Sequence, residues 1–508
     1  MTPSPSLKRA SAAVLAVGVL AALVLLIRRD DAPLQGTLDA GTPKTGKGDW
    51  TMFGGTLSRN MVNTQVKGLP AEWSTDDNEP KNIKWVADLG DRTIGSPVVA
   101  DGKVFISTNN ARDRKLQGRK AVIMAFRESD GQFLWQIAND LTEDMGKDLS
   151  STPAVVDGKP YYVSAAGQVI CAELSQGKIQ WRFDMVTNLN VHLYKPWCPA
   201  CISPSWCSPL VVGDLVFVAT GNGIDDEEKL VSPKAPSFIA LDKRTGRLVW
   251  QTALPNVNTI QAHFSSPAFT DHGGRRQVIF AGGDGVIYGF VPETGELLWK
   301  CDCLPVRKAK NDDESDNQFV GSPVIAGGKL YIGMGLAPDS PRIARARSSY
   351  FLCLDITKKG DVSLQSYNAK SPENKDSALV WAFGGSVDPK PERGRRVDFG
   401  STVSTAAVYQ GLVYMAESQG YLHCLDAATG SRIWVYDLAV ALDGSPYIAN
   451  GRVYVGTEDG DIVVFSHTRA ARIRTTVDME EYVRTTPVAA NGVLYIATQS
   501  KLYAIAAP

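Results

Sequence analysis

The chain has 508 residues, enough for one very large domain or for several domains of ordinary size. Its formal net charge of −1 excludes the basic field that nucleic-acid binding requires, so we expect no nucleic-acid partner. Glycine and proline are plentiful (46 and 28 residues) and helix-period stretches are scarce, which favours a β-rich body with many turns.

The N-terminal segment differs in composition from the rest of the chain. An uncharged apolar run, SAAVLAVGVLAALVLLI, ends at Ile27 and is about as long as the roughly 17–25 residues that a membrane-spanning helix uses. We predict a cytoplasmic N-terminus over residues 1–9, a transmembrane signal-anchor over 10–27 and a linker over 28–48. The alternative is a cleaved signal peptide, although no small-x-small site follows the run. A short N-terminal anchor favours a body on the periplasmic or extracytoplasmic side.

From about Asp49 the chain repeats. A Ser or Thr, mostly followed by Pro, opens each unit, and we call it the mark residue of that unit. Five residues later a polar turn position, often paired with Gly as in Asp101-Gly102 and Asn450-Gly451, supplies the positive φ that a two-residue hairpin needs. Alternating β-branched and aromatic segments such as KVFIST and RVYVGT follow, so each unit is expected to open with a hairpin. The mark residues, at intervals of 56, 56, 58, 56, 83, 40 and 41 residues, are Ser96, Thr152, Ser208, Ser266, Ser322, Thr405, Ser445 and Thr486.

The second half of a unit is a third strand, a Gly turn and a fourth strand. It appears clearly in ALDKRTGRLVW (240–250) and CLDAATGSRIW (424–434). The turn glycines suit the left-handed position of a short loop, and the Trp of the fourth strand is expected to fill the space between adjacent units. The residues with these roles are Gly131, Gly177, Gly246, Gly295 and Gly430 for the turns, and Trp135, Trp181, Trp250, Trp299 and Trp434 for the fourth strands.

The two ends of the body complement each other. The eighth unit stops after its third strand, and NIKWVADL with Trp85 supplies a spare strand before the first mark residue. Four short strands in each of eight units predict an all-β, eight-bladed β-propeller of antiparallel blades over residues 49–508. The N-terminal strand is expected to complete the last blade, so that no blade lacks a strand.

The LDxxTGxxxW turns at 241–250 and 425–434, together with the opening DWTMFGGTLSRN, resemble the quinoprotein (PQQ-like) β-propeller repeat family. The resemblance covers residues 49–508 and implies an eight-bladed ring with a central funnel. Members of this family include dehydrogenases that bind pyrroloquinoline quinone and BamB-like proteins that bind no cofactor and act as assembly scaffolds. Membership alone does not choose between these functions.

The cysteines divide into two groups. Cys171, Cys353 and Cys424 stand where other units have Ala or Gly, so we interpret them as small buried side chains. In PWCPACISPSWCSP (196–209), Cys198, Cys201 and Cys207, with His192 upstream, could bind a metal such as zinc or form a redox pair. Structural disulfides or buried thiols are the interpretation that we favour. The Cys301-x-Cys303 spacing is too short for an unstrained bridge within the pair, and either residue could pair with Cys207.

The family's dehydrogenases need a Ca²⁺-type cation held by oxygen ligands and a carboxylate base, and they typically carry a disulfide between adjacent cysteines. This chain has no Cys-Cys pair. Funnel residues expected just before the mark residues include Arg92, Asn317, Gln318 and Asp443, without an obvious cation-binding set, while His263 is expected to be structural.

The sequence therefore favours a BamB-like binding or assembly scaffold at the cell envelope, without a cofactor and with a protein partner at its rim or funnel. The alternatives are a dehydrogenase that uses pyrroloquinoline quinone with Ca²⁺, and a thiol or metal role for residues 198–207. No Cys directly follows the apolar run, which places lipoprotein attachment and a role in outer-membrane assembly in doubt. Basic segments at 340–350 and 388–399 are expected to be solvated insertions.

Overall fold

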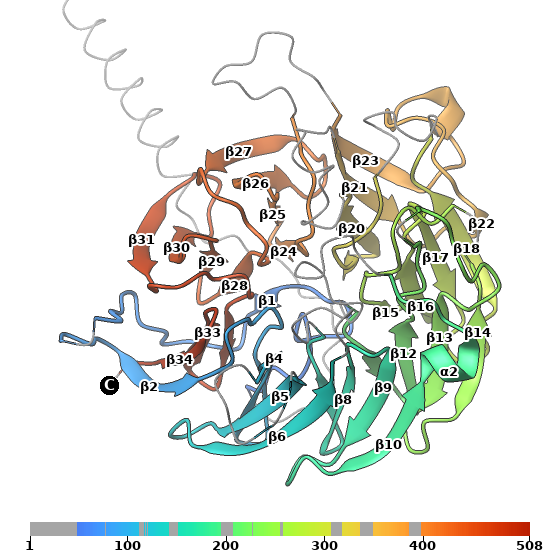
Figure 1. Cartoon of the computed structure of the whole chain (residues 1–508). Helices are drawn as coiled ribbons and strands as arrows, with labels where there is room; N and C mark the ends of the chain where they lie inside the picture. Colours follow the sequence, from blue (N-terminus) through green and yellow to red (C-terminus); the bar gives the residue numbers. More distant parts are fainter. Residues whose placement is uncertain are drawn as a thin grey trace, which may run out of the picture.

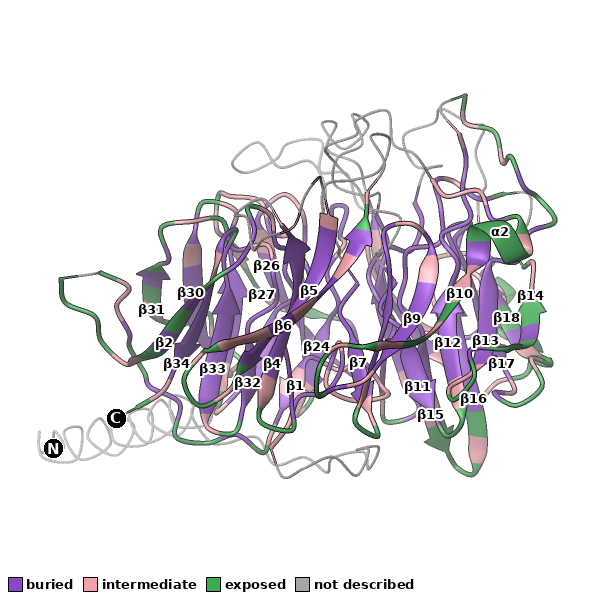
Figure 2. Ribbon diagram, turned by 60° about the horizontal axis from the view of Figure 1, so that its bottom comes forward, coloured by how far each residue is buried: buried purple, intermediate pink, exposed green. Residues whose placement is uncertain are grey.

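The computed structural model describes residues 48–507, except for 77, 111–115, 117, 119, 142–150, 195–206, 226, 255–257, 306–316, 336–348 and 386–397. These residues form eight separate sheets arranged around one axis (Figure 1), as the repeat predicts. Buried residues fill the strands, whereas exposed residues gather at the outer edges and in the connections (Figure 2). The prediction of an eight-bladed propeller is confirmed.

Each blade has four antiparallel strands from the funnel outward. Blade 1 has β3 (Val98–Ala100), β4 (Lys103–Asn109), β5 (Lys120–Arg127) and β6 (Phe133–Asp140). Blade 2 has β7 (Ala154–Val156), β8 (Lys159–Val163), β9 (Gln168–Ala172) and β10 (Ile179–Asp184), followed by the short helix α2 (Met185–Leu189). Blade 3 has β11 (Leu210–Val212), β12 (Leu215–Ala219), β13 (Phe238–Asp242) and β14 (Leu248–Thr252). Blade 4 has β15 (Ala268–His272), β16 (Arg275–Ala281), β17 (Val286–Phe290) and β18 (Leu297–Asp302).

The second half of the ring repeats this order. Blade 5 has β19 (Val324–Ala326), β20 (Lys329–Gly333), β21 (Tyr350–Asp355) and β23 (Leu379–Gly384). Blade 6 has β24 (Ala407–Tyr409), β25 (Leu412–Ala416), β26 (Tyr421–Asp426) and β27 (Arg432–Asp437). Blade 7 has β28 (Tyr447–Ala449), β29 (Arg452–Gly456), β30 (Asp461–Ser466) and β31 (Ile473–Asp478). Blade 8 has β32 (Val488–Ala490), β33 (Val493–Ala497) and β34 (Lys501–Ile505), with β2 (Ile83–Asp88) as its fourth strand.

The first hairpin of a blade turns as the sequence predicts. Asp101 and Gly102 have φ of 51° and 67°, and Asn450 and Gly451 have φ of 50° and 69°. Two consecutive residues with positive φ are the signature of the tight turn whose twist matches that of the flanking strands. The turn falls at the predicted position in every blade but blade 4, where Asp271 lies within β15 and Gly273 and Gly274 make the turn.

The chain ends close the ring. β2 pairs antiparallel with β34, and Trp85 lies opposite Ala504 in this ladder. Blade 8 is thus built from residues near both ends of the body (Figure 1), and the predicted closing strand is confirmed.

The small residue of each third strand faces the Trp of the fourth strand. Ala125 lies opposite Trp135, and Cys424 lies opposite Trp434. An indole beside a larger side chain would overfill this face, because protein interiors are close-packed. Blade 7 has no Trp and has Val464 at the small position, opposite a Thr.

Most of these Trp side chains also reach the next blade, whereas the Trp299 Nε1–H donates to Gln277 of its own blade. A Cβ on Gly131 would lie 2.6 Å from the Trp85 ring, and the Trp85 Nε1–H donates to the Glu128 carbonyl at 2.9 Å. The turn glycines therefore do two things, since they provide a positive φ and leave room for an indole. The same close approach joins Trp135 to Gly177, Trp181 to Gly246, Trp250 to Gly295 and Trp381 to Gly430.

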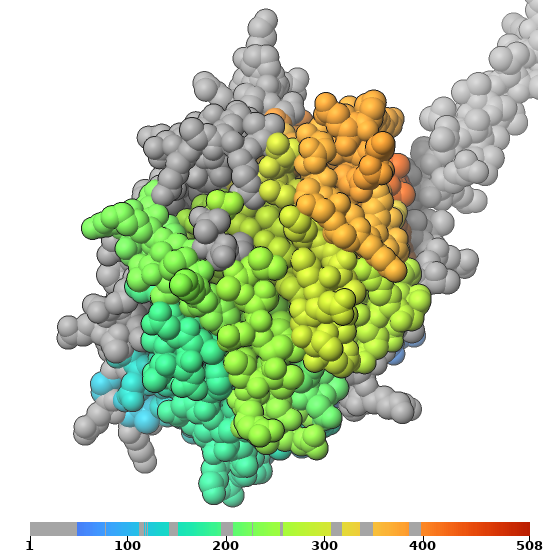
Figure 3. Space-filling model, turned by 90° about the vertical axis from the view of Figure 1, so that its right-hand side faces the viewer, coloured from blue at the N-terminus to red at the C-terminus, as the bar shows by residue number. Residues whose placement is uncertain are grey.

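Trp381 comes later in its repeat unit than the Trp of the other blades, but it occupies the same position in the fold. It lies in β23 opposite Cys353, the same cross-strand position as in the other blades. The residues before it form an insertion with a two-residue strand, β22 (Gly360–Asp361), and a 3-10 turn, η1 (Pro372–Asn374). Figure 3 shows the orange part of this insertion standing out from the outer wall, next to the yellow and green strands. The basic segments at 340–350 and 388–399 lie almost entirely outside the described residues.

A segment at the start of the body, residues 49–63, runs beneath the ring, and we call it the basal strap. It ends in β1 (Val62–Asn63), which pairs in parallel with β28. The strap bonds to the innermost strand of seven blades at the third residue after the mark residue, and it reaches blade 3 through Arg59. We call the seven strand residues that bond to the strap its seats; they are Val99, Val155, Phe269, Ile325, Val408, Ile448 and Ala489.

The membrane anchor stays a prediction. Residues 10–27 lie outside the described residues, and within the described part of the chain no helix has the length and apolarity needed to span a bilayer.

Candidate functional site

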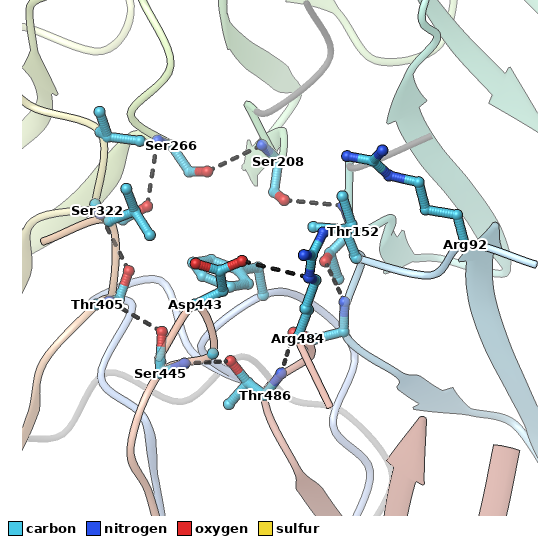
Figure 4. A pocket seen from close by; sticks show the side chains of 17 residues that line it. Arg92, Thr152, Ser208, Ser266, Ser322, Thr405, Asp443, Ser445, Arg484 and Thr486 are labelled. Carbon is cyan, nitrogen blue, oxygen red and sulfur yellow. Dashed lines mark hydrogen bonds and ion pairs between the residues drawn. The ribbon is translucent and has the colours of Figure 1, made fainter. Parts of the chain in front are cut away.

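A ring of hydrogen bonds encircles the funnel. The backbone N–H of each mark residue donates to the hydroxyl of the mark residue in the next blade, at 2.9 to 3.3 Å, and Thr486 closes the ring by donating to Ser96 (Figure 4). A short hydroxyl side chain can accept this bond from its neighbour's backbone while occupying little of the funnel. This is why Ser or Thr recurs at the mark position.

The ring surrounds a cavity of about 110 Å³ whose wall is chemically uneven. Residues two places before the mark line it in several blades. Val320 and Val403, before blades 5 and 6, make an apolar side and belong to a small apolar cluster with Phe264, whereas Ile94 stands before blade 1. Another side of the wall is charged. It is lined by Arg92, Asp443 and Arg484 (Figure 4).

Asp443 and Arg484 form ion pairs on this side. Asp443 Oδ2 lies 3.7 Å from Arg484 Nε, and Arg484 Nη2 lies 3.0 Å from Glu458 Oε1. The Arg484 guanidinium, which comes from the loop before blade 8, thus bridges the carboxylates of Asp443 and Glu458, which come from blade 7 and the loop before it. The pairs are only partly exposed, so their attraction is less screened than that of a surface salt bridge.

The basal strap closes the funnel at one end. Phe53 lines the cavity, and Arg59 lies next to it, fully buried. The Arg59 guanidinium donates to four carbonyls, at 2.8 to 3.0 Å; they belong to Phe53, Ser208, Pro209 and Pro267. Burial lowers the pKa of Arg59 to about 10. A buried charge requires such compensation, so the floor is held by one residue that joins strap, blade 3 and blade 4.

The predicted funnel residues divide into two groups. Arg92 and Asp443 line the cavity, as expected. Gln318 is buried and bonds to Gln261, and neither it nor Asn317 is among the described lining residues. His263 is structural, because its Nδ1 accepts the Gly283 N–H at 3.1 Å and burial lowers its pKa to about 3.

Three site residues were missed by sequence reasoning: Phe53, Arg59 and Arg484. Arg484 stands two places before its mark residue, as Asp443 does, and this offset could have revealed it. Phe53 and Arg59 lie in the opening motif, but their place on the axis depends on the path of the strap and has no sequence signal.

The cysteines of the described residues are free and buried. Burial raises the pKa of Cys171 to about 11 and those of Cys353 and Cys424 to about 12. Cys303 Sγ lies 3.9 Å from Cys301 Sγ. A thiolate is the reactive and metal-binding form, so these side chains act as small apolar groups.

The possible metal site predicted from the sequence lies only partly within the described residues. Cys198 and Cys201 lie outside the described residues. Cys207 is fully buried, accepts the Ala219 N–H at 3.3 Å, and has its pKa raised to about 12 by burial. The His192 backbone N–H bonds to the Asn222 side chain at 3.0 Å. Within the described ranges no group of three or more His, Cys, Asp or Glu side chains could hold a metal ion.

A quinone cofactor would need a cation with about six to eight oxygen ligands in the funnel. Asp443 is the one carboxylate that lines the described cavity, and it lies against Arg484. A guanidinium in contact with the sole carboxylate opposes a second cation at the same oxygens. The described lining therefore does not fit quinone with Ca²⁺.

The chain matches the family described as outer membrane protein assembly factor BamB over residues 119–340 and 365–507. It is 24% identical to the dehydrogenase subunit of the quinone alcohol dehydrogenase of Gluconacetobacter polyoxogenes, over 83% of this chain and 67% of that protein. It is 25% identical to the outer membrane protein assembly factor BamB of Yersinia pestis, over 35% of this chain and 37% of that protein. The solved structure of a europium-containing methanol dehydrogenase has a TM-score of 0.58 at 13% identity, covering 89% of this chain and 90% of that one, which shows a shared fold.

Proposed function

Since the chain belongs to the family described as outer membrane protein assembly factor BamB, we propose that it is an extracytoplasmic binding scaffold at the cell envelope, tethered by residues 10–27. Its rim or funnel holds a protein partner, and it carries no cofactor. No Cys directly follows the apolar run, so the tether proposed here is a helix rather than a lipid.

The composition of the funnel carries this proposal. Eight hydroxyls are held in a ring of hydrogen bonds, the floor is closed by the strap, and the carboxylate on the wall is neutralised by Arg484. These features rigidify the ring, and the described lining supplies no unpaired acid or base for catalysis. A rigid ring with variable connections is a suitable support for binding another protein.

A quinone-dependent alcohol dehydrogenase is the second candidate. It is favoured by the match to the Gluconacetobacter polyoxogenes dehydrogenase, which spans 83% of this chain. The Asp443–Arg484 pair stands against it. A thiol or metal role for residues 198–207 is a third possibility, to which the buried Cys207 would contribute poorly.

Two measurements on the full chain separate the candidates. In the first, the purified protein is incubated with pyrroloquinoline quinone and Ca²⁺, dialysed, and assayed by absorption and by dye-linked alcohol oxidation. We expect no retained chromophore and no turnover. Retained cofactor with turnover would refute the scaffold.

The second measurement places a photo-crosslinking amino acid at exposed apolar positions around the rim, in the native host. Val86, Val249, Val435 and Tyr482 are 46, 47, 38 and 52% exposed and lie in or near the outer strands of blades 8, 3, 6 and 7. We expect one discrete protein adduct confined to one arc of the rim. No adduct from any position would count against a rim-bound partner.

A further inference from the structure

The outer edge of one blade already carries an additional strand. β22 pairs in parallel with β18, with Trp299 opposite Gly360 and Lys300 opposite Asp361. The Val362 N–H continues this pairing by donating to the Lys300 carbonyl at 2.9 Å. The outermost strand of a blade in this fold can therefore accept an extended segment through its backbone groups.

β31 presents such an edge in blade 7. The Met479 N–H points inward to the Gly460 carbonyl at 2.9 Å, whereas the Asp478 carbonyl points outward and accepts the Thr75 hydroxyl at 3.0 Å. Backbone groups alternate along a strand, so those of Thr476 also point outward. Within the described residues, no hydrogen bond occupies the outward N–H and carbonyl of Thr476.

A groove runs along this edge. Its volume is about 460 Å³, and it lies between β31 and a loop made of residues 72–76 and 78–81, which stands out from the wall beside β2 and β31 (Figure 2). The loop is fixed at both sides, because the Trp73 Nε1–H donates to Met479 Sδ at 3.4 Å and Ser74 pairs with Lys81. The groove residues are Glu72, Trp73, Ser74, Thr75, Asp76, Lys81, Thr475, Thr476, Val477, Asp478 and Glu480.

The groove is acidic. Four of its side chains, Glu72, Asp76, Asp478 and Glu480, are carboxylates, and its one cation, Lys81, is paired with Glu72 at 2.9 Å. Negative charge continues onto the neighbouring strand, where burial and the nearby Asp459 and Asp478 raise the pKa of Asp461. A cationic segment bound in the groove would reduce the repulsion between these carboxylates.

We propose that the outer edge of blade 7 binds an extended, lysine- or arginine-rich segment of a protein partner, which adds to β31 as a fifth strand. The proposal rests on the scaffold function and names the surface and the chemistry of its partner. Backbone bonds to Thr476 hold the segment, and the carboxylates of the groove select its charge.

The probe is a fluorescein-labelled eight-residue peptide in which lysine alternates with threonine or valine. Two control peptides have glutamate in place of lysine, or N-methyl groups on alternate backbone nitrogens at unchanged charge. Binding to the full chain is measured by fluorescence anisotropy at low and physiological salt. We expect the lysine peptide to bind and both control peptides to bind at least tenfold more weakly.

The variants test the edge itself. Thr476→Pro removes an outward N–H and is tolerated at a sheet edge; we expect at least tenfold weaker binding. Asp478→Asn with Glu480→Gln should weaken binding several-fold and reduce its salt dependence. The matched control is Val435→Pro in blade 6, because the Leu438 N–H bonds to Gly420 there as Met479 bonds to Gly460. This control should leave affinity unchanged.

Three results would overturn the proposal. Equal binding of the N-methylated peptide would show attraction by charge alone, and equal loss in the Val435 and Thr476 variants would show that blade 7 is not the site. A dimer that Thr476→Pro dissociates would make a second copy the occupant. The scaffold function is judged separately, since a rim adduct from Val249 or Val435 but not from Tyr482 would support it and refute the blade 7 site.

Discussion

Replacing Trp85 by Ala tests the closure of the ring. Trp85 is 7% exposed, fills the space over Gly131 of blade 1, and lies opposite Ala504 of blade 8. A buried Trp→Ala change costs about 3–5 kcal/mol, and the lost bond to the Glu128 carbonyl adds about 1 kcal/mol. We therefore expect the free energy of unfolding to fall by about 4–6 kcal/mol.

The assay combines urea unfolding, followed by tryptophan fluorescence, with hydrogen exchange of the β34 amides. The matched control is Trp181→Ala, since Trp181 makes the same contacts with Gly246 and with the Lys243 carbonyl (3.0 Å) but joins two blades that are consecutive in sequence. In the Trp85 variant we expect β34 to lose protection at urea concentrations where the remaining blades keep theirs. If β34 is equally protected in both variants, closure through the chain ends does not stabilise the last blade.

Three further predictions follow from buried groups. Arg59→Met should lower the free energy of unfolding by about 3–5 kcal/mol, because four carbonyls lose their donor. The control Arg452→Met removes bonds to two carbonyls and should cost about 1–2 kcal/mol. Equal losses in urea unfolding would contradict the role of Arg59 in holding the strap. The pKa of His263 is lowered to about 3 by burial, so below pH 6.5 the unfolded chain takes up a proton that the folded chain excludes. The stability due to this group is present above pH 6.5, and the free energy of unfolding should fall by about 2 kcal/mol at pH 5. His263→Asn, which keeps an acceptor for the Gly283 N–H, should remove this pH dependence. If the pH profile of the variant equals that of the original protein, His263 is not its cause. Finally, Cys198→Ser with Cys201→Ser should leave no thiol that reacts with Ellman's reagent until guanidinium is added, and reaction of the native variant would show that a described thiol is accessible.

The repeat predicted the fold because its signals are local. A two-residue turn with Asp101 and Gly102 folds back wherever it occurs, and a Trp opposite a small residue marks the fourth strand of a blade. The closing strand could be predicted by counting, since Trp85 is spare at one end and the last unit is short by one strand at the other.

The site was harder to predict, because its parts meet only through the ring. Asp443 and Arg92 were expected from their place before the mark residues, but Arg484 pairs with Asp443 across two blades. The strap seats at Val99 and at similar positions depend on a path beneath the ring that no local pattern encodes.

The seats of the basal strap are spread over almost the whole chain, and Asn63 bonds to Ala489, 426 residues later. A ribosome that adds about 5–20 residues per second needs roughly 20–85 s to make the last of them. During that interval the basal strap cannot form all of its bonds, because some of the strands that it bonds to have not yet been made. The ring is therefore completed in a single late step, after the strand that holds Ala489 has been made, and the lifetime of the folded protein depends on how rarely the strap and the last blade detach together.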